Sequence, residues 1–135
     1  MPYLLDTDVL RYYLDDIEDA VALVTQLIPH GVVLSIITYL ELYQGTLQTP
    51  DPSQAQDRLD RLLATVPMLP LSPAVARRCA HLREELKRDG KRVRQRALDL
   101  IIAATALEHN LVLVTRNQED FDDIPDLQTR FYQAT

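Results

Sequence analysis

Three acidic residues stand where a folded chain could bring their carboxylates together. Asp6 follows the apolar run YLL, Glu41 interrupts IITYLELY, and Asp99 stands near the start of ALDLIIAATAL. Burying an unpaired carboxylate in such surroundings is costly. Two carboxylates about 4 Å apart repel each other by roughly 4 kcal/mol at an effective dielectric constant near 20, so converging acids need a cation or a shared proton. The pattern therefore predicts a site for a divalent cation.

The available ligands favour Mg²⁺ or Mn²⁺. The single cysteine, Cys79, has helical spacing with Val75 and Leu82, which is typical of a core residue, and no histidine stands at metal-ligand spacing. Ligand sets made only of oxygen favour Mg²⁺ or Mn²⁺ over Zn²⁺. Such a cation suits phosphodiester hydrolysis, because it can activate water and neutralise charge that builds on the phosphate oxygens.

Each acid also has a purely structural interpretation. Asp6 could cap a helix that begins near Thr7, and Glu41 could face solvent. Asp99 could complement the positive end of its helix dipole. The catalytic interpretation requires that the three meet in space.

Strands and helices must alternate to position these acids. Buried strands are expected at 3–6, 32–35, 68–71 and 111–115, with a last strand at 129–133; helices are expected at 7–15, 18–28, 36–47, 54–66, 73–89 and 96–109. Ser72 is the expected cap of the fifth helix, Pro73 its first residue and Gly90 its end, while 48–53 and 116–125 are expected to be a loop and a turn. Continuously apolar strands that alternate with helices predict an α/β class, a three-layer α/β/α fold around a central, mainly parallel sheet, as one domain over 1–135.

Ligands of open parallel sheets collect at the carboxyl ends of the strands. Asp6 ends the first strand, and Asn117 and Asp120 follow the strand at 111–115. Glu41 lies on the helix after the second strand, where it could point back to that edge. Asp99 belongs to the helix that leads into the strand at 111–115.

Charge is unevenly distributed along the chain. The net charge is −6, which argues against non-specific binding of polyanions over the whole surface. Nine of the 14 Lys and Arg residues nevertheless lie between positions 77 and 96, which is either a solvated helix face or a binding surface. No apolar run approaches the roughly 18 residues of a membrane helix, and the N-terminus lacks a basic leader, so a soluble cytoplasmic protein is expected.

Four motifs resemble those of the PIN domain, and within it the VapC-like toxin ribonucleases of bacterial toxin–antitoxin pairs. They are LLDTDVL, SIITYLELYQG around Glu41, DLIIAATALEHNLVLVTRNQEDF from Asp99, and DIPDL. The resemblance covers nearly the whole chain. It implies an acidic pocket that binds Mg²⁺ or Mn²⁺, cleavage of single-stranded or loop RNA, dimerisation, and inhibition by a small antitoxin whose C-terminal segment blocks the pocket.

Carried over residue by residue, the resemblance assigns Asp6, Glu41 and Asp99 to the family's first three acids. The fourth position falls on Asn117, where many relatives have Asp. Asn117 can still ligate through its carbonyl oxygen but brings no charge, and Asp120 could supply the missing carboxylate. This departure leaves open whether the site binds one metal ion or two.

Further residues of these motifs border the implied pocket. Thr7 and Thr115 are similar to family hydroxyls, with helix capping as the alternative. Asp8 is either a fifth acid or a solvated residue at the helix start, and we favour the latter.

The basic segment KRDGKRVRQR leads directly to Asp99. Arg92, Arg94 and Arg96 are therefore expected to contact phosphates of the RNA substrate, which would make binding steeply salt-dependent. Docking of an acidic antitoxin tail is the alternative for the same arginines.

Two other functions remain open at this point. LLDTDVL also resembles the nucleophile motif of haloacid-dehalogenase-type phosphohydrolases, with Asp6 as nucleophile and Asp8 as acid/base, although the Asp99 motif has no place in that scheme. A PIN-like module that binds RNA or a partner without cleavage is the other alternative, and Asn117 is its best support.

Overall fold

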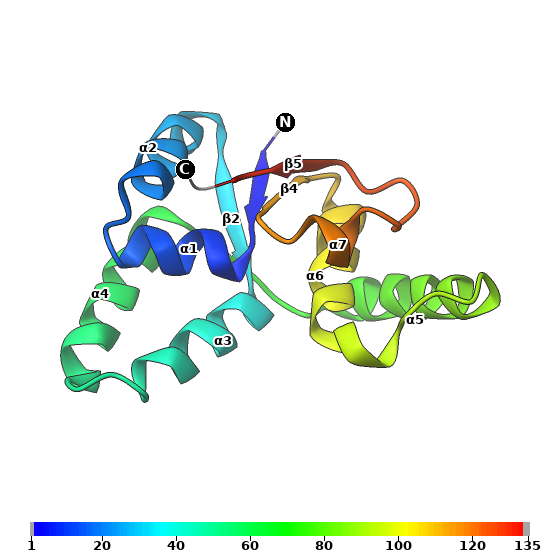
Figure 1. Cartoon of the computed structure of the whole chain (residues 1–135), viewed down its shortest axis with the longest axis horizontal. Helices are drawn as coiled ribbons and strands as arrows, with labels where there is room; N and C mark the ends of the chain where they lie inside the picture. The colour runs from blue at the N-terminus through cyan, green and yellow to red at the C-terminus, as the bar shows by residue number, and fades with distance from the viewer. Residues whose placement is uncertain (1, 134–135) are drawn as a thin grey trace.

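The computed structural model describes residues 2–133 and contains a five-stranded sheet with helices on both faces (Figure 1). The strands are β1 Tyr3–Leu5, β2 Val32–Ser35, β3 Met68–Leu69, β4 Val112–Thr115 and β5 Thr129–Phe131. They lie in the order β3-β2-β1-β4-β5, and every neighbouring pair is parallel. The expected three-layer α/β/α architecture is confirmed, and the sheet is wholly parallel within the described residues.

Seven α-helices and two short 3₁₀ helices connect the described strands. The α-helices are α1 Thr7–Leu14, α2 Glu18–Leu27, α3 Ile36–Thr46, α4 Pro52–Thr65, α5 Pro73–Arg88, α6 Ala97–His109 and α7 Gln118–Phe121; the 3₁₀ helices are η1 Ile28–His30 and η2 Arg94–Arg96. None of the helices in residues 2–133 has the length and apolar character needed to cross a bilayer.

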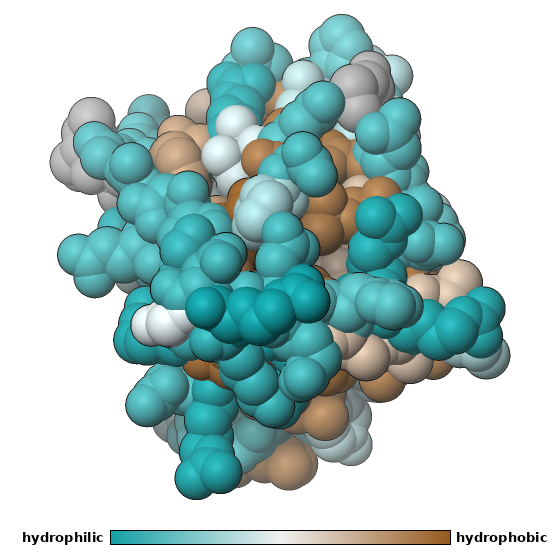
Figure 2. Space-filling view, turned by 90° about the vertical axis from the view of Figure 1, so that its right-hand side faces the viewer, coloured by the Kyte–Doolittle hydropathy of each residue, from teal (hydrophilic) through white to brown (hydrophobic). Residues whose placement is uncertain are grey.

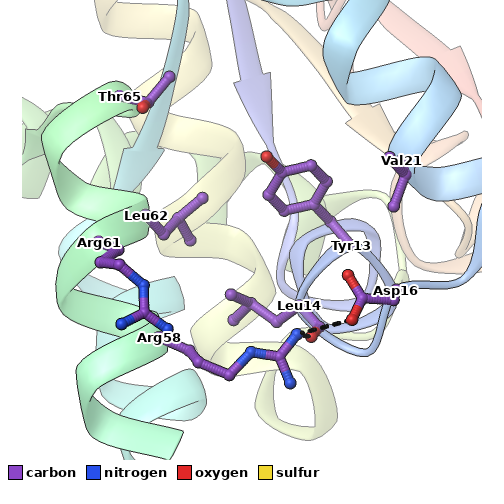
Figure 3. A pocket seen from close by; sticks show the side chains of 8 residues that line it. All are labelled: Tyr13, Leu14, Asp16, Val21, Arg58, Arg61, Leu62 and Thr65. Carbon is purple, nitrogen blue, oxygen red and sulfur yellow. Dashed lines mark hydrogen bonds and ion pairs between the residues drawn. The ribbon is translucent and has the colours of Figure 1, made fainter.

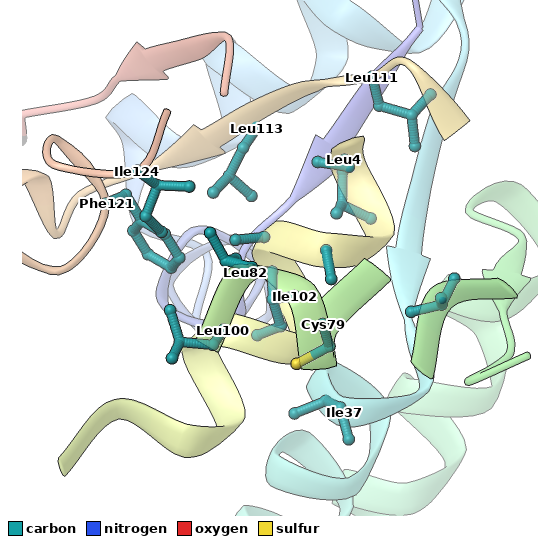
Figure 4. Packing of buried hydrophobic residues seen from close by; sticks show 14 of the residues in the cluster. Leu4, Ile37, Cys79, Leu82, Leu100, Ile102, Leu111, Leu113, Phe121 and Ile124 are labelled. Atoms are coloured by element: carbon teal, nitrogen blue, oxygen red, sulfur yellow. The ribbon is translucent and has the colours of Figure 1, made fainter. Parts of the chain in front are cut away.

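Side chains alternate along a strand, so successive residues pack on opposite faces of the sheet. Leu4 and Leu113 pack into the cluster formed with α5 and α6 (Figure 4). Their neighbours Leu5 and Val114 pack into the cluster formed with α1, α2 and α4. Cys79 is buried in the first cluster, which confirms the expected core position.

Local sequence signals set the ends of α5 as expected. The Ser72 side chain accepts a hydrogen bond from Val75 N at the start of the helix. Beyond its end, Gly90 has φ of +71°, a conformation that glycine adopts without steric cost. Lys91 N donates to Leu86 O, as in a Schellman motif.

The structure differs most from the expected elements in four places. The α4 helix begins at Pro52 instead of residue 54, because Asp51 caps it. The β3 strand has two residues instead of four, and the β5 strand ends at Phe131 instead of residue 133. The stretch 116–125, expected to be a turn, contains the short helix α7.

The strand order reverses at β1, and the sheet edge at the carboxyl ends of β1 and β4 is called the crevice. The chain passes from β1 to β2 on one side of the sheet, whereas β4 lies on the other side of β1. Such a reversal of strand order is where open α/β sheets bind ligands. The register pairs Leu5 with Val114, so Asp6 and Thr115 follow side by side at that crevice.

Candidate active site at the carboxyl edge of β1 and β4

Asp6 is held at this edge by three hydrogen bonds. Its backbone N donates to Val114 O at 2.9 Å. Its Oδ1 accepts from Thr7 N at 2.8 Å, and its Oδ2 accepts from Thr115 Oγ1 at 2.7 Å. The structural alternative for Asp6 is confirmed, since it caps α1. Capping uses one carboxylate oxygen of Asp6. The residue is only 3% exposed and remains at the crevice.

Glu41 is tied to the same edge through a threonine. Thr7 Oγ1 donates to Glu41 Oε1 at 2.6 Å and lies 3.1 Å from Thr38 Oγ1. This contact joins the first turn of α1 to the middle of α3, and it orients the Glu41 carboxylate toward α1. Glu41 is half-buried, so the solvent-facing alternative does not describe it. The sequence analysis missed Thr38, which completes the hydroxyl pair.

Asp99 lies in the first turn of α6, but it does not cap that helix. The N-cap position is Arg96, and no side-chain cap is present. Within residues 2–133, no hydrogen bond reaches the Asp99 carboxylate. Its half-buried carboxylate therefore relies on solvent and on the helix dipole for its stabilisation.

The pKa values show that the acids share one electrostatic environment. The pKa of Asp99 is raised to about 7, first by burial and then by the charges of Asp6, Asp120, Glu41 and Asp8, in that order. Like charges act on a pKa only at short range, so the five carboxylates occupy one region of the molecule.

Burial also raises the pKa of Asp6, to about 6. The hydrogen bonds from Thr115 and Thr7 lower this pKa, while the charges of Asp8 and Glu41 raise it. Two neighbouring carboxyls with pKa values near neutrality mark a site whose negative charge lacks a partner.

Asn117 and Asp8 form the rim of this site. Asn117 N donates to Thr115 Oγ1 at 3.0 Å, and Asn117 Nδ2 donates to Asp8 Oδ2 at 3.1 Å. The favoured interpretation of Asp8 as a solvated residue is too simple, because Asp8 is half-buried and contacts Asn117. Its other oxygen pairs with Arg11 at 2.8 Å.

Oxygen donors of this kind fit a hard divalent cation. Asp6, Glu41 and Asp99 could hold it, with the carbonyl oxygen of Asn117 beside them. Among residues 2–133, no three Asp, Glu, His or Cys side chains lie close enough together to hold a metal ion without waters or other ligands. Mg²⁺ commonly uses one or two carboxylates and keeps several waters, so the donor types fit this ion.

Arg96 is not available to RNA, which corrects the sequence-based assignment. Its guanidinium is buried and forms two hydrogen bonds to the Asp123 carboxylate, Nη1 to Oδ1 at 2.6 Å and Nη2 to Oδ2 at 2.8 Å. It also donates to Asp120 O at 2.9 Å and to Arg92 O at 2.8 Å. These bonds fasten the start of α6 to the segment around α7. The sequence analysis missed Asp123, since nothing in its spacing distinguishes it from its acidic neighbours.

Arg92 and Arg94 remain exposed and agree with the expected basic approach. Arg92 pairs with Asp120 at 3.6 Å, so its guanidinium lies beside the acidic rim. The face that carries α5 and α7 is covered mainly by hydrophilic side chains (Figure 2).

Arg116, between Thr115 and Asn117, fixes the end of β4. Its guanidinium carbon lies 4.4 Å from the centre of the Tyr12 ring and 5.9 Å from that of Tyr132. This cation–π contact attaches the strand end to α1. The sequence analysis did not identify Arg116, because only the fold brings these aromatic rings to it.

A separate pocket of about 240 Å³ lies at the other end of α1 (Figure 3). Its lining comes from α1, α2, α4 and the α1–α2 turn and includes Tyr13, Leu62 and Arg61. Arg58 crosses it to reach Leu14 O and Asp16. These bonds hold α4 to the end of α1, and the lining contains none of the acids at the crevice.

A profile of the PIN domain matches residues 3–127. The chain belongs to the PIN-domain family. This membership confirms the resemblance drawn from the motifs around Asp6, Glu41 and Asp99. It leaves the dehalogenase-type interpretation without support, since that scheme accounted for the first motif alone.

Individual relatives within this family agree with the expected nuclease class. Ribonuclease VapC1 of Haemophilus influenzae is 32% identical over 130 residues, which cover 95% of this chain and 96% of the relative. The structure of VapBC2 from Rickettsia felis bound to a promoter DNA fragment superposes with a TM-score of 0.89 at 27% identity, covering 98% of this chain and 100% of its counterpart. A toxin–antitoxin complex from Klebsiella pneumoniae superposes with a TM-score of 0.73 at 28% identity, covering 98% of this chain and 99% of its counterpart.

Proposed function

We propose that this PIN-domain protein is a Mg²⁺- or Mn²⁺-dependent endoribonuclease and the toxin of a toxin–antitoxin pair. The observation that carries the proposal is the hydrogen-bond network at the β1–β4 edge, where Thr7 contacts both Asp6 and Glu41 and Thr115 holds the other oxygen of Asp6. The raised pKa of Asp99, to which the charges of Asp6 and Glu41 contribute, supports its place beside them. The VapC-type relatives support the same activity and the same kind of partner.

The chain's own residues prepare the site for this reaction. When bound, a divalent cation supplies an activated water and neutralises charge on the phosphate. Asp6, Glu41 and Asp99 hold that cation. Thr115 and Thr7 keep Asp6 and Glu41 in place, since a neutral hydroxyl donor orients a carboxylate without cancelling its charge.

Arg92 and Arg94 form a basic rim, whose positive charge reduces the repulsion between the acidic site and the RNA phosphates. Arg92 and Arg94 are exposed near the start of α6 and contact backbone phosphates in this proposal. Asp120 orients Arg92 through their ion pair and adds to the acidic charge that acts on Asp99. Binding that depends on such contacts weakens as salt rises.

The cleavage test uses a fluorescently labelled RNA hairpin with a single-stranded loop. Wild-type protein should cleave this RNA in the presence of Mg²⁺ or Mn²⁺, and EDTA should stop the cleavage. Asp6→Ala and Asp99→Asn each lower the rate by at least about a hundredfold, since loss of even an outer residue of a metal site costs 10–100-fold. Asp57→Asn, which removes an exposed carboxylate from α4, is the matched control and retains the wild-type rate. Equal rates in all four proteins would exclude this site as the nuclease centre.

The second candidate is a PIN module that binds RNA without cleaving it, and Asn117 favours it because this residue adds no charge to the site. Binding of the hairpin by wild-type protein, with no cleavage in Mg²⁺ or Mn²⁺, would select this function over the nuclease.

The partners follow from the same proposal. A small antitoxin covers the crevice with its C-terminal segment, and the toxin acts in the cytoplasm as a homodimer. Co-expression of the antitoxin should suppress hairpin cleavage, and light scattering on the purified chain should give twice the monomer mass. A monomeric mass would exclude the homodimer without affecting the nuclease proposal.

A further inference from the structure

Asp8 and Asn117 form a hydrogen-bonded pair that is connected to the buried carboxylate of Asp6. Asn117 Nδ2 donates to Asp8 Oδ2 at 3.1 Å. Asn117 N donates to Thr115 Oγ1 at 3.0 Å, and Thr115 Oγ1 donates to Asp6 Oδ2 at 2.7 Å. One chain of hydrogen bonds thus runs from the rim of the crevice to its interior, and it joins the loop after β4 to the first turn of α1.

The position of Asp8 is fixed by its neighbours along α1 and by Asn117. It follows Thr7, which contacts both Asp6 and Glu41, in the first turn of α1, and its Oδ2 accepts the hydrogen bond from Asn117 Nδ2. Its Oδ1 also pairs with Arg11 at 2.8 Å, but both side chains are partly exposed, at 32% and 46%. Exposed ion pairs contribute little, so Arg11 does not withdraw Asp8 from the site.

Asp120 is the competing carboxylate, and its environment is different. It lies on the short helix α7 and pairs with the exposed Arg92 at 3.6 Å. None of the side-chain hydrogen bonds in residues 2–133 runs from a neutral donor to the Asp120 carboxylate. Asp8 therefore has the better-defined orientation, because a neutral amide already connected to the interior of the site holds it.

We propose that Asn117 is a positioning residue that holds Asp8 as the outer carboxylate of the cation site. In this arrangement Asp8 accepts hydrogen bonds from the water shell of the cation, and Asn117 keeps the accepting oxygen in place. The inference rests on the proposed metal-dependent function. It explains how a neutral side chain at position 117 is compatible with a cation site, since the negative charge is supplied from position 8 across a 3.1 Å hydrogen bond.

The test is an exchange of charge between the two positions, measured as Mn²⁺ affinity. The full chain is titrated with Mn²⁺, and the free ion is followed by electron paramagnetic resonance, so that no catalysis is needed. Asp8→Asn should weaken Mn²⁺ binding about tenfold, as expected for a residue in the outer shell of a metal site. Asp15→Asn, which removes an exposed carboxylate just after α1, is the matched control and should bind like wild type.

The double variant Asp8→Asn/Asn117→Asp restores the charge with the donor and acceptor reversed. It should recover Mn²⁺ affinity to within about threefold of wild type, because the cation's water shell again meets one charged oxygen at the rim. Circular dichroism of each variant establishes that the fold is retained.

Three results would overturn the inference, and they separate it from the proposed function. If Asp8→Asn binds Mn²⁺ like Asp15→Asn while Asp6→Asn loses binding, the cation site stands and Asp8 has no part in it. If a folded double variant stays as weak as Asp8→Asn, the two residues do not act as a unit. If wild type binds no Mn²⁺, the metal-dependent function and the outer carboxylate fail together.

Discussion

Replacing Asp99 by Asn tests whether the buried charge of Asp99 destabilises the fold in the absence of a cation. The two side chains have nearly the same shape, so the change removes the charge and leaves the packing of α6 in place. The two explanations of Asp99 predict opposite signs. A carboxylate in the first turn of a helix stabilises it by about 0.3–1 kcal/mol through the dipole, so the dipole alone predicts that the variant is less stable.

Burial of the charge, together with repulsion by the neighbouring acids, predicts that the variant is more stable, and the structure sets the size of the effect. The pKa of Asp99 rises from 3.8 to about 7, mainly through burial and then through the charges of Asp6 and Asp120. A shift of this size corresponds to about 4 kcal/mol between the two protonation states. The carboxylate is only half-buried and is screened by solvent, so we expect about 1–2 kcal/mol at neutral to basic pH.

The sign of the pH dependence follows from the raised pKa. The folded protein binds the Asp99 proton more tightly than the unfolded chain does, so the stabilisation is complete below about pH 4 and is lost as the pH rises through about 7. Asn does not ionise, so Asp99→Asn does not lose stability in this way as the pH rises. In EDTA, the variant should match or fall slightly below wild type near pH 4 and exceed its free energy of unfolding at pH 8.

Urea unfolding at the two pH values measures this difference directly. Adding Mg²⁺ at pH 8 to a hundred times the wild-type dissociation constant should stabilise wild type by about 2.7 kcal/mol, for binding to the folded protein alone, and should stabilise the variant less. The reasoning is refuted if Asp99→Asn in EDTA is less stable than wild type at pH 8. That outcome would assign Asp99 to the helix dipole.

Three other changes have expected results of known direction. Arg96→Met should lower the free energy of unfolding by about 3 kcal/mol, because it removes a buried guanidinium and leaves its carboxylate partner unpaired. Arg94 is exposed on the same 3₁₀ helix, so the free energy of unfolding of Arg94→Ala should stay within about 0.5 kcal/mol of the wild-type value in the same urea titration. Thr7→Val should cost about 1 kcal/mol and weaken Mn²⁺ binding, since Glu41 loses its 2.6 Å hydrogen bond; unchanged Mn²⁺ affinity would show that this bond does not orient the carboxylate. Leu100→Ala should cost about 2–5 kcal/mol by calorimetry, because its side chain is fully buried in the core.

The fold was largely predictable because its signals are local. Ser72, Pro73 and Gly90 mark the two ends of α5 in the sequence, and the structure places the cap and the positive φ there. Continuous apolar strands indicated a sheet covered on both faces. The α7 helix was missed, since four residues between acidic turns carry no hydrophobic period.

The site was predictable only as far as residue type and strand position allow. Asp6 and Asn117 follow strands that the pattern identifies, so their place at the crevice could be expected. The fate of Arg96 could not, because its burial depends on Asp123, a contact across 27 residues that no spacing reveals. Arg96 and Arg94 look equivalent in the sequence, yet one holds α6 in place and the other faces solvent.

The neutral donors explain how the chain keeps several carboxylates at one edge and still folds. Thr115 and Thr7 donate to Asp6 and Glu41, and an arginine in their place would cancel the charge that a cation needs. The guanidinium groups of Arg92 and Arg96 pair instead with Asp120 and Asp123. Hydroxyls therefore orient the inner acids Asp6 and Glu41, the Asn117 amide orients Asp8, and the guanidinium of Arg96 holds the start of α6. This division leaves the crevice with unbalanced negative charge, which is the condition for binding a divalent cation there.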